Sequence, residues 1–123
     1  MSNPTELKYT SDHIWIKENS GNLLIGITDY AQEQLGDILF VDLPEAGKAF
    51  EAGEAFFEIE SQKTAQELSL PFGGEVIASN DALDDSPELI NEDAFEAWIV
   101  EIKPSGAVEG VMGSSEYEES IQE

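Results

Sequence analysis

Short apolar segments separated by turn residues make up most of this chain, and they are the feature that most constrains its fold. Residues 13–18 alternate apolar and polar side chains, residues 19–22 read Asn-Ser-Gly-Asn, and residues 23–27 are apolar again. Alternation with a period of two is typical of a half-buried strand, and two such segments joined by an Asn/Gly turn predict a hairpin. Further segments of strand character lie at residues 38–43, 55–60, 68–77 (broken at Pro71 and Gly73) and 97–103. Many short strands with Gly and Pro punctuation predict a small, mainly β sandwich or barrel.

Three stretches depart from strand character: residues 28–36 and 115–118 predict short helices, and residues 84–91 predict an acidic loop with a helical turn. In residues 28–36, Thr28 suits the N-cap and Gly36 can close the C-terminus. In residues 84–91, Pro87 suits the first helical position. In residues 115–118, Ser115 and Glu118 have the spacing of a capping box.

The length and composition predict a single domain, residues 1–123. A chain of 123 residues, 41% of them hydrophobic, can bury one core. No segment approaches the roughly 20 apolar residues of a membrane span, and residues 1–6 lack the basic region of an export signal. These features predict a soluble, cytoplasmic protein.

Acidic residues dominate the charge of the chain. The chain has 27 acidic residues, five lysines and no arginine, so its formal net charge is −22. Nucleic acids and anionic membranes both select Lys and Arg, so neither is an expected partner. Such a charge favours a monomer and partners with basic docking patches. The chain also has no cysteine, so redox chemistry would need an attached group.

Lys63 is notable because it is a rare basic residue in acidic surroundings. It follows Glu58-Ile59-Glu60-Ser61-Gln62, and a turn-rich run starts at Leu70. A hairpin tip between two strands would present the lysine amine to a modifying enzyme. An ordinary solvated surface lysine is the plainer interpretation, and composition alone favours it.

Motifs along the whole chain change that judgement. They are Tyr9-Thr10-Ser11-Asp12-His13, the run from Gly26 to Asp37, Val41-Asp42-Leu43-Pro44, Glu60-Ser61-Gln62-Lys63, Gly74-Glu75-Val76, Ser86-Pro87-Glu88-Leu89-Ile90-Asn91, Trp98 and Ile102-Lys103-Pro104. With them the chain resembles the H protein of the glycine cleavage system over essentially its full length. The long run from Gly26 is specific, whereas Glu-Ser-x-Lys alone is a weak signal.

The resemblance implies a barrel-sandwich hybrid, the lipoyl-domain-like fold, with a few short helices. It implies lipoate in amide linkage on Lys63, with Glu60 read by the lipoylating enzyme, a lipoate ligase or lipoyl transferase. Such a carrier is not an enzyme, and no catalytic residue or metal site is expected in it. It moves an aminomethyl group and electrons between a pyridoxal-phosphate glycine decarboxylase, an aminomethyltransferase and a dihydrolipoyl dehydrogenase. Biotin carriers share the fold, but their lysine usually lies between two methionines, whereas Lys63 lies between Gln62 and Thr64.

The chain departs from the family pattern at three places. Residues 13–15 read His-Ile-Trp where His-Glu-Trp is common, residues 62 and 64 are Gln and Thr where Val and Ala are usual, and residue 97 is Ala where Gly is usual. In glycine-cleaving members that acidic residue helps hold the loaded arm in a surface cleft, and Ile14 cannot pair with an amine. Two alternatives with the same arm stay open: an H-like lipoate-binding protein of a heterodisulfide-reductase-like sulfur-oxidation system, and a lipoate donor or relay protein.

The other candidate residues have structural interpretations. His13 is the only histidine and adjoins Ile14 and Trp15, so we expect it to pack or hydrogen-bond rather than to catalyse. Trp15 and Trp98 are expected to anchor the core.

Overall fold

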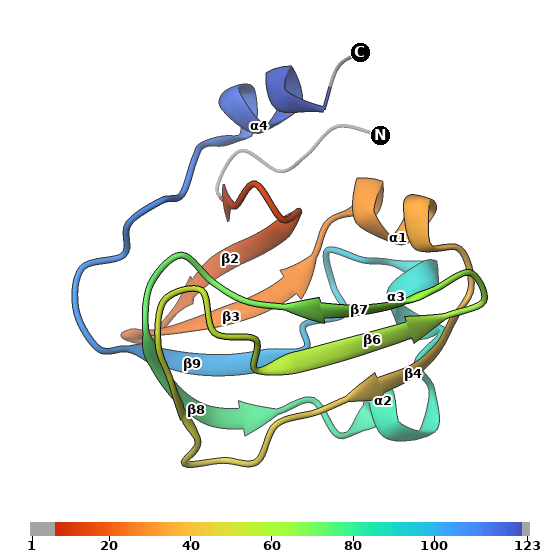
Figure 1. The fold of residues 1–123 in the computed structure, drawn as a ribbon, viewed down its shortest axis with the longest axis horizontal. Helices are drawn as coiled ribbons and strands as arrows, with labels where there is room; N and C mark the ends of the chain where they lie inside the picture. Colours follow the sequence, from red (N-terminus) through yellow and green to blue (C-terminus); the bar gives the residue numbers. More distant parts are fainter. Residues whose placement is uncertain (1–6, 122–123) are drawn as a thin grey trace.

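Two antiparallel β-sheets face each other, and short helices lie around them (Figure 1). The structure, a computed structural model, describes residues 7–121. The sequence-based prediction for residues 1–6 concerns a segment outside the described residues. The predicted mainly β architecture with a few short helices is confirmed.

The larger sheet has six strands in the order β1-β2-β3-β9-β8-β5. They are β1 (Lys8–Tyr9), β2 (Ile14–Asn19), β3 (Asn22–Ile27), β9 (Val100–Pro104), β8 (Gly74–Ser79) and β5 (Ala49–Phe50). Strands β2 and β3 form the predicted hairpin. Its two turn residues, Ser20 and Gly21, have φ of 53° and 88°. Positive φ at both central positions matches the right-handed twist of a two-residue hairpin, and Gly at the second position allows it.

The smaller sheet has three strands in the order β4-β6-β7. They are β4 (Ile38–Asp42), β6 (Phe57–Ser61) and β7 (Ala65–Leu68). The register of β4 against β6 shifts between Ile38 and Phe40. Such an irregularity twists an edge strand and disfavours pairing with another chain. Pro71 lies between β7 and β8, where the chain crosses from the smaller sheet to the larger one.

Within residues 7–121, four short helices complete the fold: α1 (Asp29–Leu35), α2 (Ala82–Asp85), α3 (Leu89–Glu92) and α4 (Ser114–Ser120). Helix α1 has the predicted caps. The Thr28 hydroxyl accepts the N–H of Ala31 at 3.2 Å, and Gly36 ends the helix at a φ of 80°. These caps fix where the chain leaves α1 for β4.

The acidic loop predicted at residues 84–91 has more helix than its single predicted turn. The acidic segment forms two helices, α2 and α3, and Pro87 lies two residues before α3 instead of opening it. The two helices are separated at Ser86, the residue before Pro87, whose φ of −136° and ψ of 65° lie outside the helical region. Leu83 and Ile90 are fully buried and anchor one helix each.

The predicted capping box at the C-terminus is wrong. Helix α4 begins at Ser114, with Gly113 as N-cap and no side-chain cap bond, so Ser115 lies inside the helix. The packing of Tyr117 accounts for this start, because its ring stacks on Tyr9 with centroids 4.8 Å apart. The last strand is also shorter than predicted: β9 begins at Val100, and residues 97–99 have no regular secondary structure.

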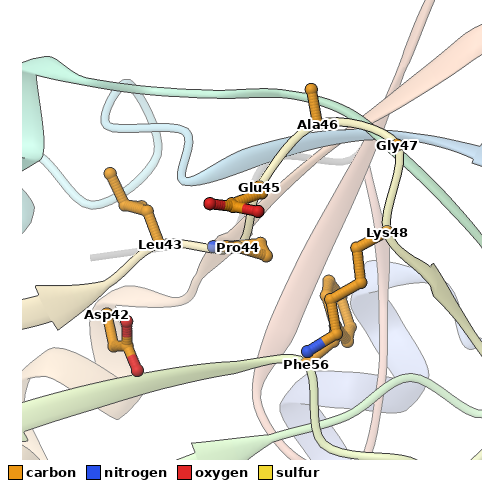
Figure 2. A pocket seen from close by; sticks show the side chains of 8 residues that line it. All are labelled: Asp42, Leu43, Pro44, Glu45, Ala46, Gly47, Lys48 and Phe56. Carbon is orange, nitrogen blue, oxygen red and sulfur yellow. The ribbon is translucent and has the colours of Figure 1, made fainter.

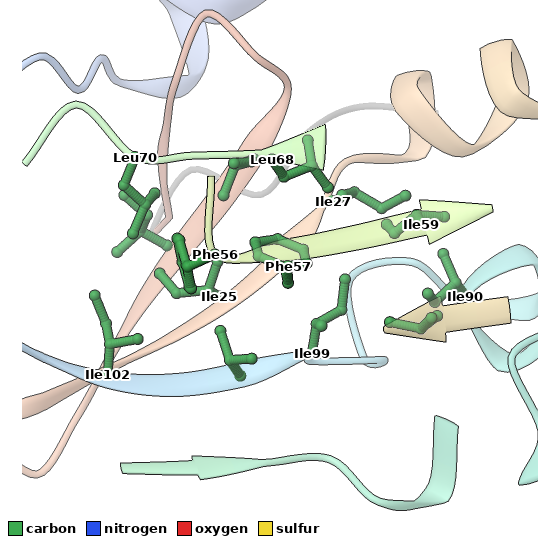
Figure 3. Packing of buried hydrophobic residues seen from close by; sticks show 14 of the residues in the cluster. Ile25, Ile27, Phe56, Phe57, Ile59, Leu68, Leu70, Ile90, Ile99 and Ile102 are labelled. Atoms are coloured by element: carbon green, nitrogen blue, oxygen red, sulfur yellow. The ribbon is translucent and has the colours of Figure 1, made fainter. Parts of the chain in front are cut away.

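The core lies between the two sheets. Ile25, Ile59 and Ile102 come from three different strands and have no exposed surface. Figure 3 shows the side chains of β6 and β7 pointing toward those of β3 and β9. The rings of Phe50 and Phe56 stack with centroids 4.0 Å apart and join the two sheets. Facing apolar side chains from two sheets are the packing of a sandwich.

A second buried cluster lies outside the main core. Its buried members are Leu7, Tyr9, Trp15 and Tyr117. Trp15 is confirmed as a core anchor, since it is 1% exposed and its indole N–H donates to the Ala94 carbonyl at 2.9 Å. Trp98 is only partly buried and packs at the margin of this cluster.

His13 has a structural position, as the sequence predicts. Its Nδ1 lies 2.9 Å from the hydroxyl of Tyr117, which lies 2.6 Å from the hydroxyl of Thr28. Burial lowers the pKa of His13, and Asp12 opposes this effect. Burial raises the pKa of Tyr117 to about 12. These contacts join α4 to the start of α1.

Candidate functional site

The β6–β7 hairpin presents Lys63 at its tip, and the two strands pair in continuous register below it. The turn closes where the N–H of Ser61 donates to the Thr64 carbonyl at 2.7 Å. The Ser61 hydroxyl accepts the N–H of Lys63 at 3.3 Å and that of Thr64 at 3.2 Å. The Lys63 side chain is exposed. The serine of the Glu-Ser-x-Lys motif therefore shapes the turn that holds the lysine, a role that sequence reasoning missed.

The tip rests on residues 36–38, which join α1 to β4 and include the first residue of β4; we call them the shelf. The N–H of Gln62 donates to the carbonyl of Asp37 at 2.9 Å. A Cβ on Gly36 would lie 3.4 Å from Cε of Lys63, so the stem of the lysine lies over the glycine. Gly36 has a φ of 80°, a conformation that glycine adopts without strain.

Asn91, on α3, makes hydrogen bonds to the shelf. Its Nδ2 donates to the Gly36 carbonyl at 2.9 Å and to Oε1 of Gln32 at 2.8 Å. Its Oδ1 accepts the N–H of Ile38 at 2.8 Å. Gln32 in turn donates to Asp29 at 2.9 Å. Three elements, α1, α3 and β4, therefore meet beneath the hairpin.

Glu60 lies on β6, three residues before Lys63, and its side chain is exposed. Phe57 and Ile59 are buried on the same strand, so the alternation of β6 turns Glu60 outward. The structure thus places both predicted site residues on one hairpin, with Glu60 facing solvent.

Three carboxylates cross the outer face of the smaller sheet. Glu58 on β6 pairs with Asp42 on β4 and with Glu67 on β7. Directly opposed residues of one sheet face are close neighbours, and like charges there destabilise the sheet. We call these three residues the carboxylate row. It makes the hairpin face acidic.

Ile14 does not face an open cleft. It is fully buried and belongs to the main core cluster together with Ile27 and Ile59. The sequence-based interpretation placed residue 14 at a surface cleft, and the structure places its side chain in the interior. Strand β2 explains this, because Ile14 pairs with Ile27 on the face toward the smaller sheet.

A separate groove of about 570 Å³ lies beside residues 42–48. Figure 2 shows Lys48 extending over Phe56, with Asp42 across the groove. Lys48 is exposed like Lys63, but it lies in a loop after Gly47 and not between paired strands. It is therefore a matched lysine outside the hairpin tip.

The described part of the chain offers neither a metal-type cluster nor a membrane-spanning helix. Within residues 7–121, no group of three or more His, Asp or Glu side chains could hold a metal ion. Over the same residues, no helix is long and apolar enough to cross a membrane.

Comparison with known proteins gives a consistent result. A sequence profile described as "Glycine cleavage H-protein" matches residues 7–123. The glycine cleavage system H protein of Halalkalibacterium halodurans is 50% identical over 127 residues, covering 100% of this chain and 99% of the relative. The chain belongs to the glycine cleavage H-protein family. The H protein of Ralstonia nicotianae is also 50% identical, with 96% of each chain covered. The crystal structure of an H protein from Mycobacterium marinum matches with a TM-score of 0.87 at 38% identity, covering 94% of this chain and 95% of that one.

Membership of the H-protein family confirms the resemblance and the lipoyl-domain-like fold. The protein is a lipoyl carrier component of the glycine cleavage system, and members of the family carry lipoate on a lysine. The sulfur-oxidation alternative is not favoured, because the relatives named above are all H proteins of glycine cleavage.

Proposed function

We propose that Lys63 is the lysine that carries lipoate, in amide linkage to its side-chain amine. The observation that supports this most directly is its position: it is an exposed lysine at the tip of a hairpin whose turn and shelf are both hydrogen-bonded. Rigid placement of one amine at the surface suits a modifying enzyme and the later partners alike. Lys48 shares the exposure but lacks the hairpin.

The attached group would supply a dithiolane, the disulfide couple that a chain without cysteine lacks. The contribution of the chain is positional. The hairpin holds the amine at the surface, and the tether raises the effective concentration of the attached group at each partner. The protein is thus a non-catalytic carrier, working as a monomer.

We propose that the lipoate ligase or lipoyl transferase recognises Glu60. It is exposed on the same hairpin and lies three residues before Lys63. Its carboxylate could accept hydrogen bonds from a basic group of the enzyme. The downstream partners are the pyridoxal-phosphate glycine decarboxylase, the aminomethyltransferase and the dihydrolipoyl dehydrogenase, and the acidic hairpin face favours basic docking patches on them.

The test is the intact mass of the protein after co-expression with a lipoylating enzyme. One added lipoyl group is expected in the parent protein and in Lys48→Ala, and none in Lys63→Ala. Glu60→Gln should be lipoylated on the order of tenfold more slowly, since it loses a charged hydrogen-bond partner. A lipoyl group that persists in Lys63→Ala would refute the assignment.

A further inference from the structure

We propose that Asn91 is a positioning residue for Lys63: it fixes the shelf, and the shelf holds the tip of the hairpin and the stem of the lysine. The proposal rests on Lys63 being the attachment residue. It deepens that proposal by naming what orients the amine.

The side chain of Asn91 is fully engaged. Both hydrogens of its amide group have acceptors, Gln32 and the Gly36 carbonyl, and its oxygen has a donor, the N–H of Ile38. Its neighbour on α3, Ile90, is completely buried and anchors the helix in the core. Asn91 thus connects a fixed helix to the shelf, in which Gly36 has no side chain, Asp37 is exposed and Ile38 packs in the core.

The geometry of the shelf passes this constraint to the hairpin tip. Asn91 makes hydrogen bonds to the residues on both sides of Asp37. It donates to the carbonyl of Gly36 and accepts from the N–H of Ile38. Fixing both flanks fixes the direction of the Asp37 carbonyl, which accepts the N–H of Gln62 at 2.9 Å. Gln62 is the residue directly before Lys63. Two hydrogen bonds therefore link α3 to Gln62, the residue bonded to the carrier lysine in the chain.

The stem of the lysine depends on the same segment. Gly36 lies beneath Cε, Cδ and Cγ of Lys63, at 3.4, 3.8 and 3.9 Å from the position that a Cβ would take. If Gly36 moved, the surface on which the stem lies would change with it. An amine that samples more directions reacts more slowly, because fewer encounters have the reacting geometry.

The chemistry requires an amide at this position. The substitution Asn91→Asp would keep the acceptor for Ile38 but would turn an oxygen toward two other oxygens, those of Gly36 and Gln32. The substitution Asn91→Ala would remove all three bonds while leaving Ile90 in the core. The two variants therefore disrupt the hydrogen bonds between residue 91 and the shelf in two different ways.

Asn80 offers a matched control. It is half-buried like Asn91, and its Nδ2 donates to a backbone carbonyl, that of Trp98, at 2.8 Å. It lies after β8 and has no bond to the shelf or the hairpin among the contacts found in residues 7–121. Asn80→Ala removes a comparable side-chain bond elsewhere in the fold.

The first measurement is amide hydrogen exchange by NMR on the full chain, with and without lipoate. In Asn91→Ala and Asn91→Asp, the Gln62 amide should exchange on the order of tenfold faster than in the parent protein. The amide of Ile99, which donates to the Ile25 carbonyl in the core, should be unchanged. Asn80→Ala should leave Gln62 at the parent rate.

The second measurement is the rate of lipoylation of each variant. We expect kcat to fall about fivefold with KM within about twofold, because positioning is lost while the exposed recognition face is kept. Equal acceleration at Gln62 and Ile99 would mean a general loss of stability and would overturn the proposal. So would parent-like exchange at Gln62 together with parent-like kcat. Lipoylation of Lys63→Ala would instead refute the attachment residue and leave the exchange result standing.

Discussion

Gly26 shows how strictly a single position can be constrained in this fold. It lies on β3 opposite Trp15 on β2, and a Cβ there would be 2.5 Å from two atoms of the Trp15 ring. The ring cannot turn away freely, because its N–H donates to the Ala94 carbonyl. The glycine is therefore required for space, not for an unusual backbone conformation.

We expect Gly26→Ala to lower the free energy of unfolding by about 2–4 kcal/mol. Overpacking costs about 1–3 kcal/mol, and loss of the buried indole bond adds about 1 kcal/mol. Gly106→Ala is the control, since no other atom lies within 4 Å of the Cβ position there. Urea unfolding of both variants measures the difference. Similar values for the two would show that Trp15 can move at no cost.

At the scale of elements, the parts predicted from sequence are those with local signals. The β2–β3 turn and the caps of α1 depend on residues next to each other in the chain, and both are confirmed. The hairpin at Lys63 was predicted for the same reason, since strands flank it on both sides.

Contacts between distant segments could not be predicted. Asn91 binds residues 53 to 59 positions away, and Tyr117 binds Thr28 across 89 positions. No local pattern reports such pairs. The error at Ser115 has the same origin, because packing of Tyr117 against Tyr9, and not a cap, accompanies the observed start of α4.

The contact between α4 and the start of α1 should depend on pH. Burial lowers the pKa of His13 in the folded protein, so the unfolded chain binds the proton more readily. The stability contributed by neutral His13 is thus present above its ordinary pKa of 6.5 and is lost as the pH falls below it. The charge of Asp12 opposes this lowering of the His13 pKa. The hydroxyl of Tyr117 is hydrogen-bonded to the His13 ring.

Comparison with His13→Asn isolates this effect, because asparagine tolerates the positive φ of 67° at this position. The parent protein should lose more stability than the variant between pH 7.5 and 5.5, measured by urea unfolding. All carboxylates are common to both proteins, so their titration cancels in the difference. An identical change in the two proteins would contradict a lowered pKa for the half-buried His13.

At the scale of the whole molecule, the net charge of −22 acts against the compact state. The repulsion is concentrated in places such as the carboxylate row, where Glu58 lies between Asp42 and Glu67. Salt shortens the range of these forces, since the Debye length falls from about 30 Å at 0.01 M to about 10 Å at 0.1 M. The fold should therefore become more stable over this range.

We expect the free energy of unfolding to rise by about 1–2 kcal/mol between 0.01 and 0.1 M NaCl, as repulsion is screened. Glu58→Gln should show a gain smaller by about 0.5 kcal/mol, because it removes the central charge of the row. Glu109→Gln removes one charge from an exposed loop and should respond to salt like the parent protein. Thermal and urea unfolding at both salt concentrations measure the three proteins. Equal salt gains for the Glu58 and Glu109 variants would mean that the repulsion is spread over the surface and that the row has no special share of it.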